Sequence, residues 1–137
     1  MTTSMRRLMP ALVLAAAAAC HDSSTSPTNT VIGTYALATV NGQALPFQFT
    51  LSTGEKLTLN SDLVTLRDDG TYSDIGKWTS SASGNFTVTE VGTYSETNGT
   101  ITFFDQTDGI TYQGTLAGSV LTESSGTMTQ VYQKVEL

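Results

Sequence analysis

The sequence predicts an all-β domain whose antiparallel strands form an up-and-down meander that closes into a barrel of about eight strands. From Val31 onward, short runs of alternating polar and apolar residues are separated by turn signals at roughly 8–12-residue spacing. After Ala19 no stretch places apolar residues at helical spacing, so almost no helix is expected. Threonine, which suits the solvated face of a sheet, is the most frequent residue, with 25 copies.

The turn signals divide this domain into nine expected strands. They lie near residues 32–40, 44–51, 56–67, 71–79, 86–97, 100–107, 110–117, 120–123 and 127–135. The first hairpin is irregular, because pairing around Asn41-Gly42 would put Phe47 and Phe49 on the wrong face. Pro46 has no N–H to donate to a strand ladder, so we expect a break or bulge there.

The centre of the meander contains two strong hairpin signals, Asn98-Gly99 and Asp108-Gly109. Two-residue turns at these positions place Phe103 opposite Tyr94 on one side and opposite Gly114 on the other. Both turns then agree on which face is apolar and which is covered with hydroxyl groups. A slip of one residue would destroy that agreement, so the register is strongly specified.

Two further strand positions follow from the pattern. Asp68-Asp69-Gly70 fits a three-residue loop with Gly in the left-handed conformation, which sets Leu66 opposite Tyr72. The last strand fits two alternative inward sets, Met128 with Tyr132 or Val131 with Val135.

The N-terminus has the layout of a secretory signal peptide over residues 1–19. Arg6-Arg7 is followed by an apolar run, Leu8 to Ala19, that ends in small residues before Cys20, the only cysteine. The run is about half of the ~20 residues that a transmembrane helix needs, so we expect no permanent span. An ordinary secretory signal would leave Cys20 as a free thiol, which is a liability in an oxidising compartment.

Ala17-Ala18-Ala19-Cys20 resembles the lipobox of bacterial lipoproteins, although Ala17 stands where leucine is usual. The resemblance implies that the signal is cut before Cys20, whose sulfur takes a diacylglycerol and whose amine is acylated. Residues 20–30 would then be the lipidated cysteine and a flexible tether. His21 follows the cysteine in place of Asp, which by the family's sorting rule implies the outer membrane, on its periplasmic or surface face, in a host that has one.

A second resemblance covers residues 31–137. Gly33-Thr34-Tyr35 on the first strand, the run of hairpins and the repeated Gly-Thr-aromatic segments resemble the lipocalin-like domain of small bacterial lipoproteins. The lipocalin Gly-x-Trp is Gly-x-Tyr here. The resemblance implies a β-barrel whose interior is either filled by side chains or holds one small ligand.

Charge and composition exclude several function classes. The net charge is −6, and without residues 1–19 it becomes −8, from 4 basic and 12 acidic side chains. Such a surface repels nucleic acid and anionic lipid. With His21 as the only histidine and Cys20 acylated, no His- or Cys-based nucleophile or soft-metal cluster can form. We therefore expect no enzyme, no cofactor and no metal.

The acidic residues fall into two groups. One group lies mostly in or beside expected turns, where Asp caps the backbone rather than binding a metal: Asp62, Asp68, Asp69, Asp105 and Asp108. Strand alternation puts a second set on the apolar side, either at barrel ends or at the mouth of a pocket: Glu96, Asp105, Asp74 and Glu123.

Five aromatic residues are the candidate ligand-binding set, although they also suit a plain core: Tyr72, Trp78, Tyr94, Phe103 and Tyr112. We expect a monomeric envelope lipoprotein, held at the membrane through Cys20, whose barrel binds a small, partly apolar ligand. The alternative is a structural or interaction lipoprotein with a filled core that acts through its outer surface or loops.

Overall fold

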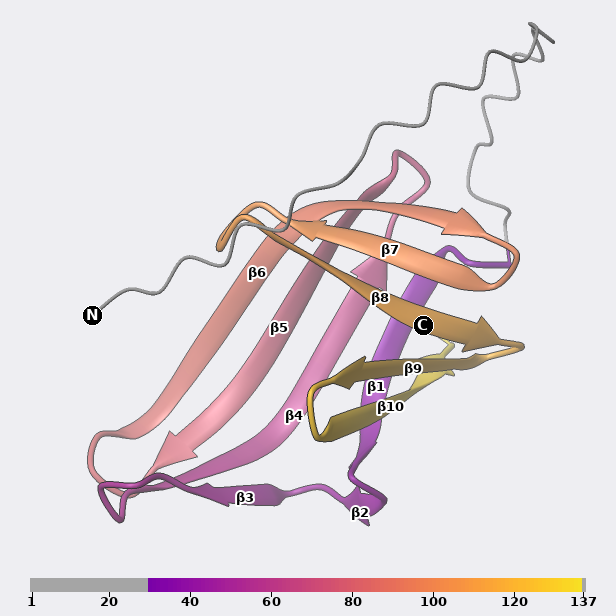
Figure 1. Cartoon of the computed structure of the whole chain (residues 1–137). Helices are drawn as coiled ribbons and strands as arrows, with labels where there is room; N and C mark the ends of the chain where they lie inside the picture. Colours follow the sequence, from indigo (N-terminus) through magenta and orange to yellow (C-terminus); the bar gives the residue numbers. More distant parts are fainter. Residues whose placement is uncertain (1–29, 137) are drawn as a thin grey trace, which may run out of the picture.

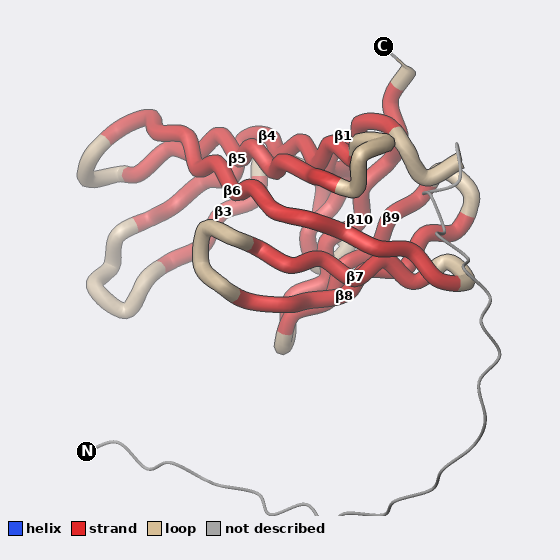
Figure 2. The backbone as a smooth tube through the Cα atoms, turned by 90° about the horizontal axis from the view of Figure 1, so that it is seen from above, coloured by secondary structure: helices blue, strands red, loops and turns tan. Residues whose placement is uncertain are grey.

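The computed structural model describes residues 30–136 as one antiparallel sheet of ten strands without helices (Figure 2). The strands are β1 (Gly33–Val40), β2 (Gln43–Ala44), β3 (Phe47–Thr50), β4 (Lys56–Leu66), β5 (Thr71–Ser80), β6 (Gly84–Thr97), β7 (Thr100–Asp105), β8 (Ile110–Ala117), β9 (Val120–Ser125) and β10 (Met128–Val135). The predicted signal peptide, Cys20 and most of the tether lie outside the described residues. Within residues 30–136 no helix is long and apolar enough to span a membrane.

Eight of the strands close into the predicted barrel (Figure 1). Each strand from β4 to β10 pairs with the next, and β1 lies between β10 and β4. The closing ladder joins Gly33 to Leu66 and Ala36 to Leu63. The β3–β4 and β5–β6 hairpins extend beyond the other strands on one side, as Figures 1 and 2 both show.

The predicted registers are confirmed at two turns and wrong at a third. Tyr94 pairs with Phe103 and Leu66 pairs with Tyr72, as Asn98-Gly99 and Asp68-Asp69-Gly70 predict. The β7–β8 loop instead spans residues 106–109, so that Phe103 faces Tyr112 rather than Gly114. The Asp105 side chain accepts hydrogen bonds from the backbone amides of Thr107 (2.7 Å) and Asp108 (3.4 Å), which stabilises this longer loop. Because the error is two residues, the inward face is unchanged.

The irregular first hairpin contains the expected break. Val40 pairs with Gln43 for a single tight turn, and the chain then leaves β1 at a cis Leu45-Pro46 bond. From Phe47 the chain pairs with β4 instead of β1. The rings of Phe47 and Phe49 thereby pack against the core. A continuous hairpin would have placed them on the opposite face.

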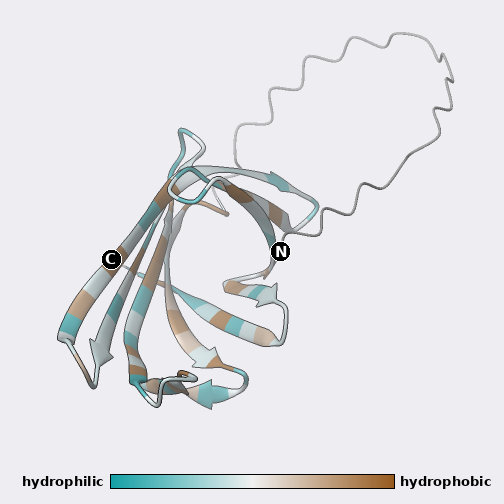
Figure 3. Cartoon of the chain, turned by 60° about the vertical axis from the view of Figure 1, so that its left-hand side comes forward, coloured by the Kyte–Doolittle hydropathy of each residue, from teal (hydrophilic) through white to brown (hydrophobic). Residues whose placement is uncertain are grey.

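One end of the barrel interior, which we call the packed end, is filled by fully buried side chains: Tyr35, Leu66, Tyr72, Ile101 and Phe103. The Tyr72 and Phe103 rings meet edge to face, with centroids 5.0 Å apart. The Tyr35 hydroxyl donates to the Val31 carbonyl at 2.6 Å, so this phenol is buried without an unmet hydrogen bond. Figure 3 shows apolar and polar residues alternating along the strands that enclose this core.

Two other features of the interior follow from close packing. Tyr132 is buried and Met128 packs against the core, so the first of the two alternatives for the last strand is the observed one. Gly70 has φ +78°, as its loop requires, but Gly92 serves a different purpose. A Cβ there would lie 1.9 Å from the Phe104 carbonyl oxygen, so only glycine permits this approach of β6 to β7.

Candidate functional site

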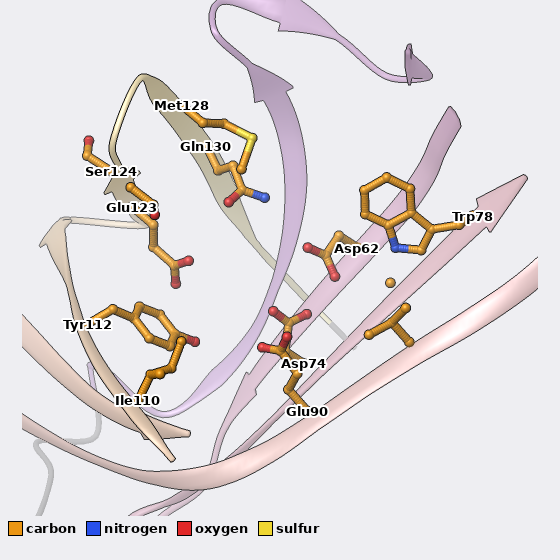
Figure 4. A pocket seen from close by; sticks show the side chains of 13 residues that line it. Asp62, Asp74, Trp78, Glu90, Ile110, Tyr112, Glu123, Ser124, Met128 and Gln130 are labelled. Atoms are coloured by element: carbon orange, nitrogen blue, oxygen red, sulfur yellow. The ribbon is translucent and has the colours of Figure 1, made fainter. Parts of the chain in front are cut away.

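The other end of the barrel holds a cavity of about 260 Å³, which we call the acidic pocket (Figure 4). Its carboxylates are Asp62, Asp74, Glu90 and Glu123, and its apolar and aromatic walls are Trp78, Val88, Ile110, Tyr112 and Met128. Gly76, Ser124, Ser125 and Gln130 complete the lining. None of these thirteen residues is Lys, Arg or His, so the lining supplies no positive charge.

Strand register brings the carboxylates together. Asp74 on β5 pairs directly with Glu90 on β6, and both side chains point inward. Asp62 lies two residues before Val64, the partner of Asp74 on β4, and therefore points to the same side. Glu123 reaches the pocket from β9, and in Figure 4 its carboxylate points toward those of Asp62 and Asp74.

Asp62 and Asp74 form a coupled pair deep in the pocket. Asp62 is only 7 % exposed, and its Oδ2 accepts a hydrogen bond from the Tyr132 hydroxyl at 3.0 Å. Its Oδ1 and the Oδ1 of Asp74 have no donor among residues 30–136 other than a proton held between the two carboxyls. Burial, followed by hydrogen bonding to Asp62 and its charge, raises the pKa of Asp74 to about 10. Asp74 thus carries a proton at neutral pH.

Glu123 is a further buried acid of the pocket, with an oxygen that is unpaired within residues 30–136. It is 8 % exposed, and its Oε1 finds no hydrogen-bond donor in the part of the chain that the structure describes. Burial is the main cause that raises its pKa to about 8, and the charges of Asp62 and Glu90 add to it. The pKa of Glu90 is raised as well, first by burial and then by the charges of Asp105 and Asp108.

Aromatic rings form two walls of the pocket. The Trp78 indole stacks with the exposed Phe86 ring at 6.3 Å and 11°. The Tyr112 ring stacks on Phe103 with centroids 4.8 Å apart, and its hydroxyl donates to the Tyr72 hydroxyl at 3.4 Å. A Cβ on Gly76 would lie 2.8 Å from Trp78 Nε1, so glycine leaves room for the indole.

The five aromatic residues predicted as a ligand-binding set therefore occupy two places. Trp78 and Tyr112 line the pocket. Tyr72 and Phe103 are sealed in the core beside Tyr112, and Tyr94 is buried with its hydroxyl donating to the Arg67 carbonyl at 2.5 Å. Only the first two can contact a molecule in the cavity without rearrangement of the core.

The predicted inward acids divide in the same way. Asp74 and Glu123 line the pocket, whereas Glu96 Oε1 accepts from the Gly99 amide at 2.8 Å and Asp105 caps the β7–β8 loop. The assignment of Asp62 to a turn is wrong, because it lies in the middle of β4 and points into the cavity.

Glu90 was not predicted at all, although a signal for it exists in the sequence. It has the same strand parity as Gly92, Tyr94 and Glu96, all of which lie on the inward side of β6. Extending the alternation four residues back from Tyr94 would have placed Glu90 inside.

One cluster has the spacing of a metal site. Carboxylate oxygens of Glu90, Asp105 and Asp108 all lie within 4.8 Å of one another, a set of hard oxygen ligands of the kind that Ca²⁺ prefers. Asp105 Oδ1 already accepts two backbone amides, whereas its buried Oδ2 has no donor among the described residues.

Comparisons with protein-family models, with curated proteins and with solved structures found no match to this chain.

Proposed function

We propose that this chain is a lipid-anchored lipoprotein of the bacterial cell envelope whose barrel binds a small, partly apolar molecule in the acidic pocket. The observation that carries the proposal is the cavity itself, about 260 Å³ lined by aromatic and aliphatic walls and a few convergent polar groups. Small-molecule sites have this composition, with volumes of roughly 300–1,000 Å³ for drug-sized ligands. The smaller volume here favours a ligand below that size.

The anchoring part of the proposal depends on the sequence. Arg6-Arg7, the apolar run before Cys20 and the small residues preceding it support lipid attachment at that cysteine. Two or three acyl chains, at ~0.8 kcal/mol per buried CH₂, would hold the protein on a membrane essentially permanently. Metabolic labelling with palmitate should mark the wild-type chain and leave Cys20→Ser unlabelled; equal labelling would contradict the anchor.

Native mass spectrometry of the full chain, purified from its own host's membranes, tests the binding function. We expect a retained small molecule that is lost in Val88→Trp, which adds bulk at the pocket wall, and kept in Val91→Trp. The two valines are matched, because both are about half exposed on β6 but Val88 lines the pocket and Val91 points outward. A ligand-free mass, or a ligand retained equally by both variants, would contradict binding in this pocket.

One observation favours the alternative of an interaction lipoprotein. The outer face of β4 to β7 exposes a group of apolar side chains, Leu63, Ile75, Val91 and Phe104, of which Leu63 is 40 % and Phe104 44 % exposed. Leu63 and Ile75 are direct cross-strand neighbours, so the group is more continuous than scattered surface residues. A ligand-free pocket, together with a protein partner lost on Ile75→Thr, would support this alternative instead.

A further inference from the structure

The carboxylates of the acidic pocket have no counter-charge within the described protein. Residues 30–136 contain four basic side chains, and none of them lines the pocket. Arg67 donates to the Ser73 hydroxyl, Lys134 donates to the Thr30 carbonyl, and Lys56 and Lys77 are exposed. Carboxylates buried as deeply as Asp62 and Glu123 are normally paired with a cation or with several donors. Within residues 30–136, only protons are present to supply the compensating charge, and a bound molecule would be a second source.

A bound metal ion fits these carboxylates poorly. In the described residues the carboxylate trio with oxygens within 4.8 Å of one another is Glu90, Asp105 and Asp108. Asp62, Asp74 and Glu123 do not meet at that spacing, so one ion cannot touch all three at metal–oxygen distances of about 2.3–2.6 Å.

An ammonium group fits the same carboxylates better. Its three N–H donors act separately, so it can bond Glu123 and one member of the Asp62–Asp74 pair and still donate to a further acceptor. The aromatic faces beside it would add cation–π attraction, and they would also contact an apolar substituent.

We propose that the acidic pocket binds an organic cation, namely a primary amine that carries one aromatic or aliphatic group. Its ammonium is held between Glu123 and the Asp62–Asp74 pair, and its apolar part contacts Trp78 and Tyr112. This inference rests on the proposed binding function and specifies the class of ligand. The Oε1 of Glu123, which is enclosed and without a donor among the described residues, is the atom that such a ligand would satisfy first.

Binding of a cation here should release protons. The titratable groups that face the pocket or its carboxylates are Asp62, Asp74, Glu90, Asp105, Asp108, Glu123, Tyr72, Tyr112 and Tyr132, and no cationic group is among them. With pKa values of about 10 for Asp74 and about 8 for Glu123, these two acids carry protons at neutral pH that an ammonium would displace. Affinity for the amine should therefore rise with pH as long as the amine remains charged.

Trp78 provides a direct readout, because it is the only tryptophan of the chain and lines the pocket. The full chain in a maltoside detergent would be titrated with 2-phenylethylamine and with 2-phenylethanol, its neutral counterpart, while Trp78 fluorescence is followed. At about pH 8 and low salt we expect the amine to bind at least about tenfold more tightly than the alcohol. At about pH 5.5 this preference should shrink, because Glu123 is then protonated.

Two matched variants locate the ammonium. Glu123→Gln keeps the shape of the side chain, and should weaken amine binding at least about fivefold while leaving alcohol binding unchanged. Glu136→Gln makes the same chemical change at an exposed position and should alter neither. If Glu123→Gln fails to fold, the comparison of the two ligands and the pH dependence in the wild-type protein still decide the question.

Several outcomes would overturn the inference. They distinguish a failure of the organic-cation proposal from a failure of the proposed binding function. Equal affinity for alcohol and amine would mean a neutral ligand. That result would support binding in the pocket and contradict the proposal that the ligand is an organic cation. No response of Trp78 to either compound would count against both. A Trp78 response to CaCl₂ that abolishes amine binding would identify an inorganic cation instead. Undiminished amine preference in Glu123→Gln would place the ammonium elsewhere.

Discussion

Along β5, Tyr72 at the packed end is sealed among apolar side chains, whereas Trp78, six residues later, lines an open cavity with four carboxylates around it. The same strands build both ends of the barrel, so the difference lies in the inward residues and not in the backbone. At the packed end the buried Tyr35 hydroxyl is satisfied by its hydrogen bond to the Val31 carbonyl. At the pocket end, oxygens of Asp62, Asp74 and Glu123 have no donor among the described residues.

The two ends of the barrel therefore have different roles: the packed end stabilises the fold, and the acidic pocket has the composition of a ligand site. Apolar burial at the packed end stabilises the closed barrel, and unpaired buried acids at the other end reduce its stability. Local violations of folding rules of this kind are typical of functional sites. Substitutions at the two ends should therefore change the free energy of unfolding by different amounts and with different pH dependence.

The largest effect is expected for Phe103→Ala at the packed end. Phe103 is 0 % exposed and contacts the rings of Tyr72 and Tyr112. Its truncation should lower the free energy of unfolding by about 4 kcal/mol, measured by urea denaturation. Phe104→Ala, the outward-facing neighbour, should cost less than about 1 kcal/mol. Similar losses for both variants would contradict a core confined to one face.

Two glycine variants sharpen the contrast between the ends. Gly92→Ala forces a methyl against the Phe104 carbonyl, which is backbone and cannot yield, so we expect a loss of about 3 kcal/mol. Gly76→Ala meets the Trp78 side chain instead, which can turn aside, and should cost about 1 kcal/mol while shifting Trp78 fluorescence. A greater loss of stability for Gly76→Ala than for Gly92→Ala would contradict the expectation that a clash with backbone costs more than a clash with a movable side chain.

The stability of the ligand-free protein should fall as pH rises. Folding raises the pKa of Asp74 to about 10 and that of Glu123 to about 8, so the native state binds more protons than the unfolded state above about pH 4. The free energy of unfolding is therefore highest at acid pH and declines as pH passes through these values.

Thermal unfolding at about pH 5 and pH 8.5 tests this direction. Asp74→Asn should remove part of the dependence and be about 1–2 kcal/mol more stable than wild type at the higher pH. The exposed control Glu136→Gln should follow the wild-type curve. A wild-type protein that is more stable at pH 8.5 than at pH 5 would contradict the buried, uncompensated state of these acids.

The smallest effect is expected for Tyr132→Phe. The variant removes the hydroxyl that donates to Asp62 Oδ2 and leaves the ring in the core, at a cost of about 1 kcal/mol in the free energy of unfolding. Amine binding should persist, because the carboxylates remain. Loss of amine binding with unchanged stability would assign the Tyr132 hydroxyl to the ligand and not to Asp62.

Much of the packed end could be predicted from the sequence, because turn chemistry specifies register. Asn98-Gly99 and Asp68-Asp69-Gly70 placed Tyr94, Phe103, Leu66 and Tyr72 correctly. The Asp108-Gly109 register was wrong because the Asp105 side chain caps a longer loop, a competition that the turn residues alone do not reveal.

The pocket end was harder to predict. A register shift between Leu59 and Ser61 changes which residues of β4 face inward, so Leu57 and Leu59 mislead about Asp62, whereas its parity with Leu66 predicts its inward position. The inward position of Glu90 was predictable from strand parity, but the cavity was not. Its volume depends on where Trp78 and Tyr112 lie in three dimensions, and spacing in the sequence does not specify that.

The most direct test of the central claim is a carboxyl-carbon NMR titration of the full chain without ligand. We predict that Glu123 titrates with a pKa of about 8 and Asp74 with a pKa of about 10. Addition of 2-phenylethylamine should lower both raised values. Ordinary pKa values near 4 for Glu123 and Asp74 would mean that their charges are already compensated. That result would contradict the proposal that the acidic pocket binds a cation.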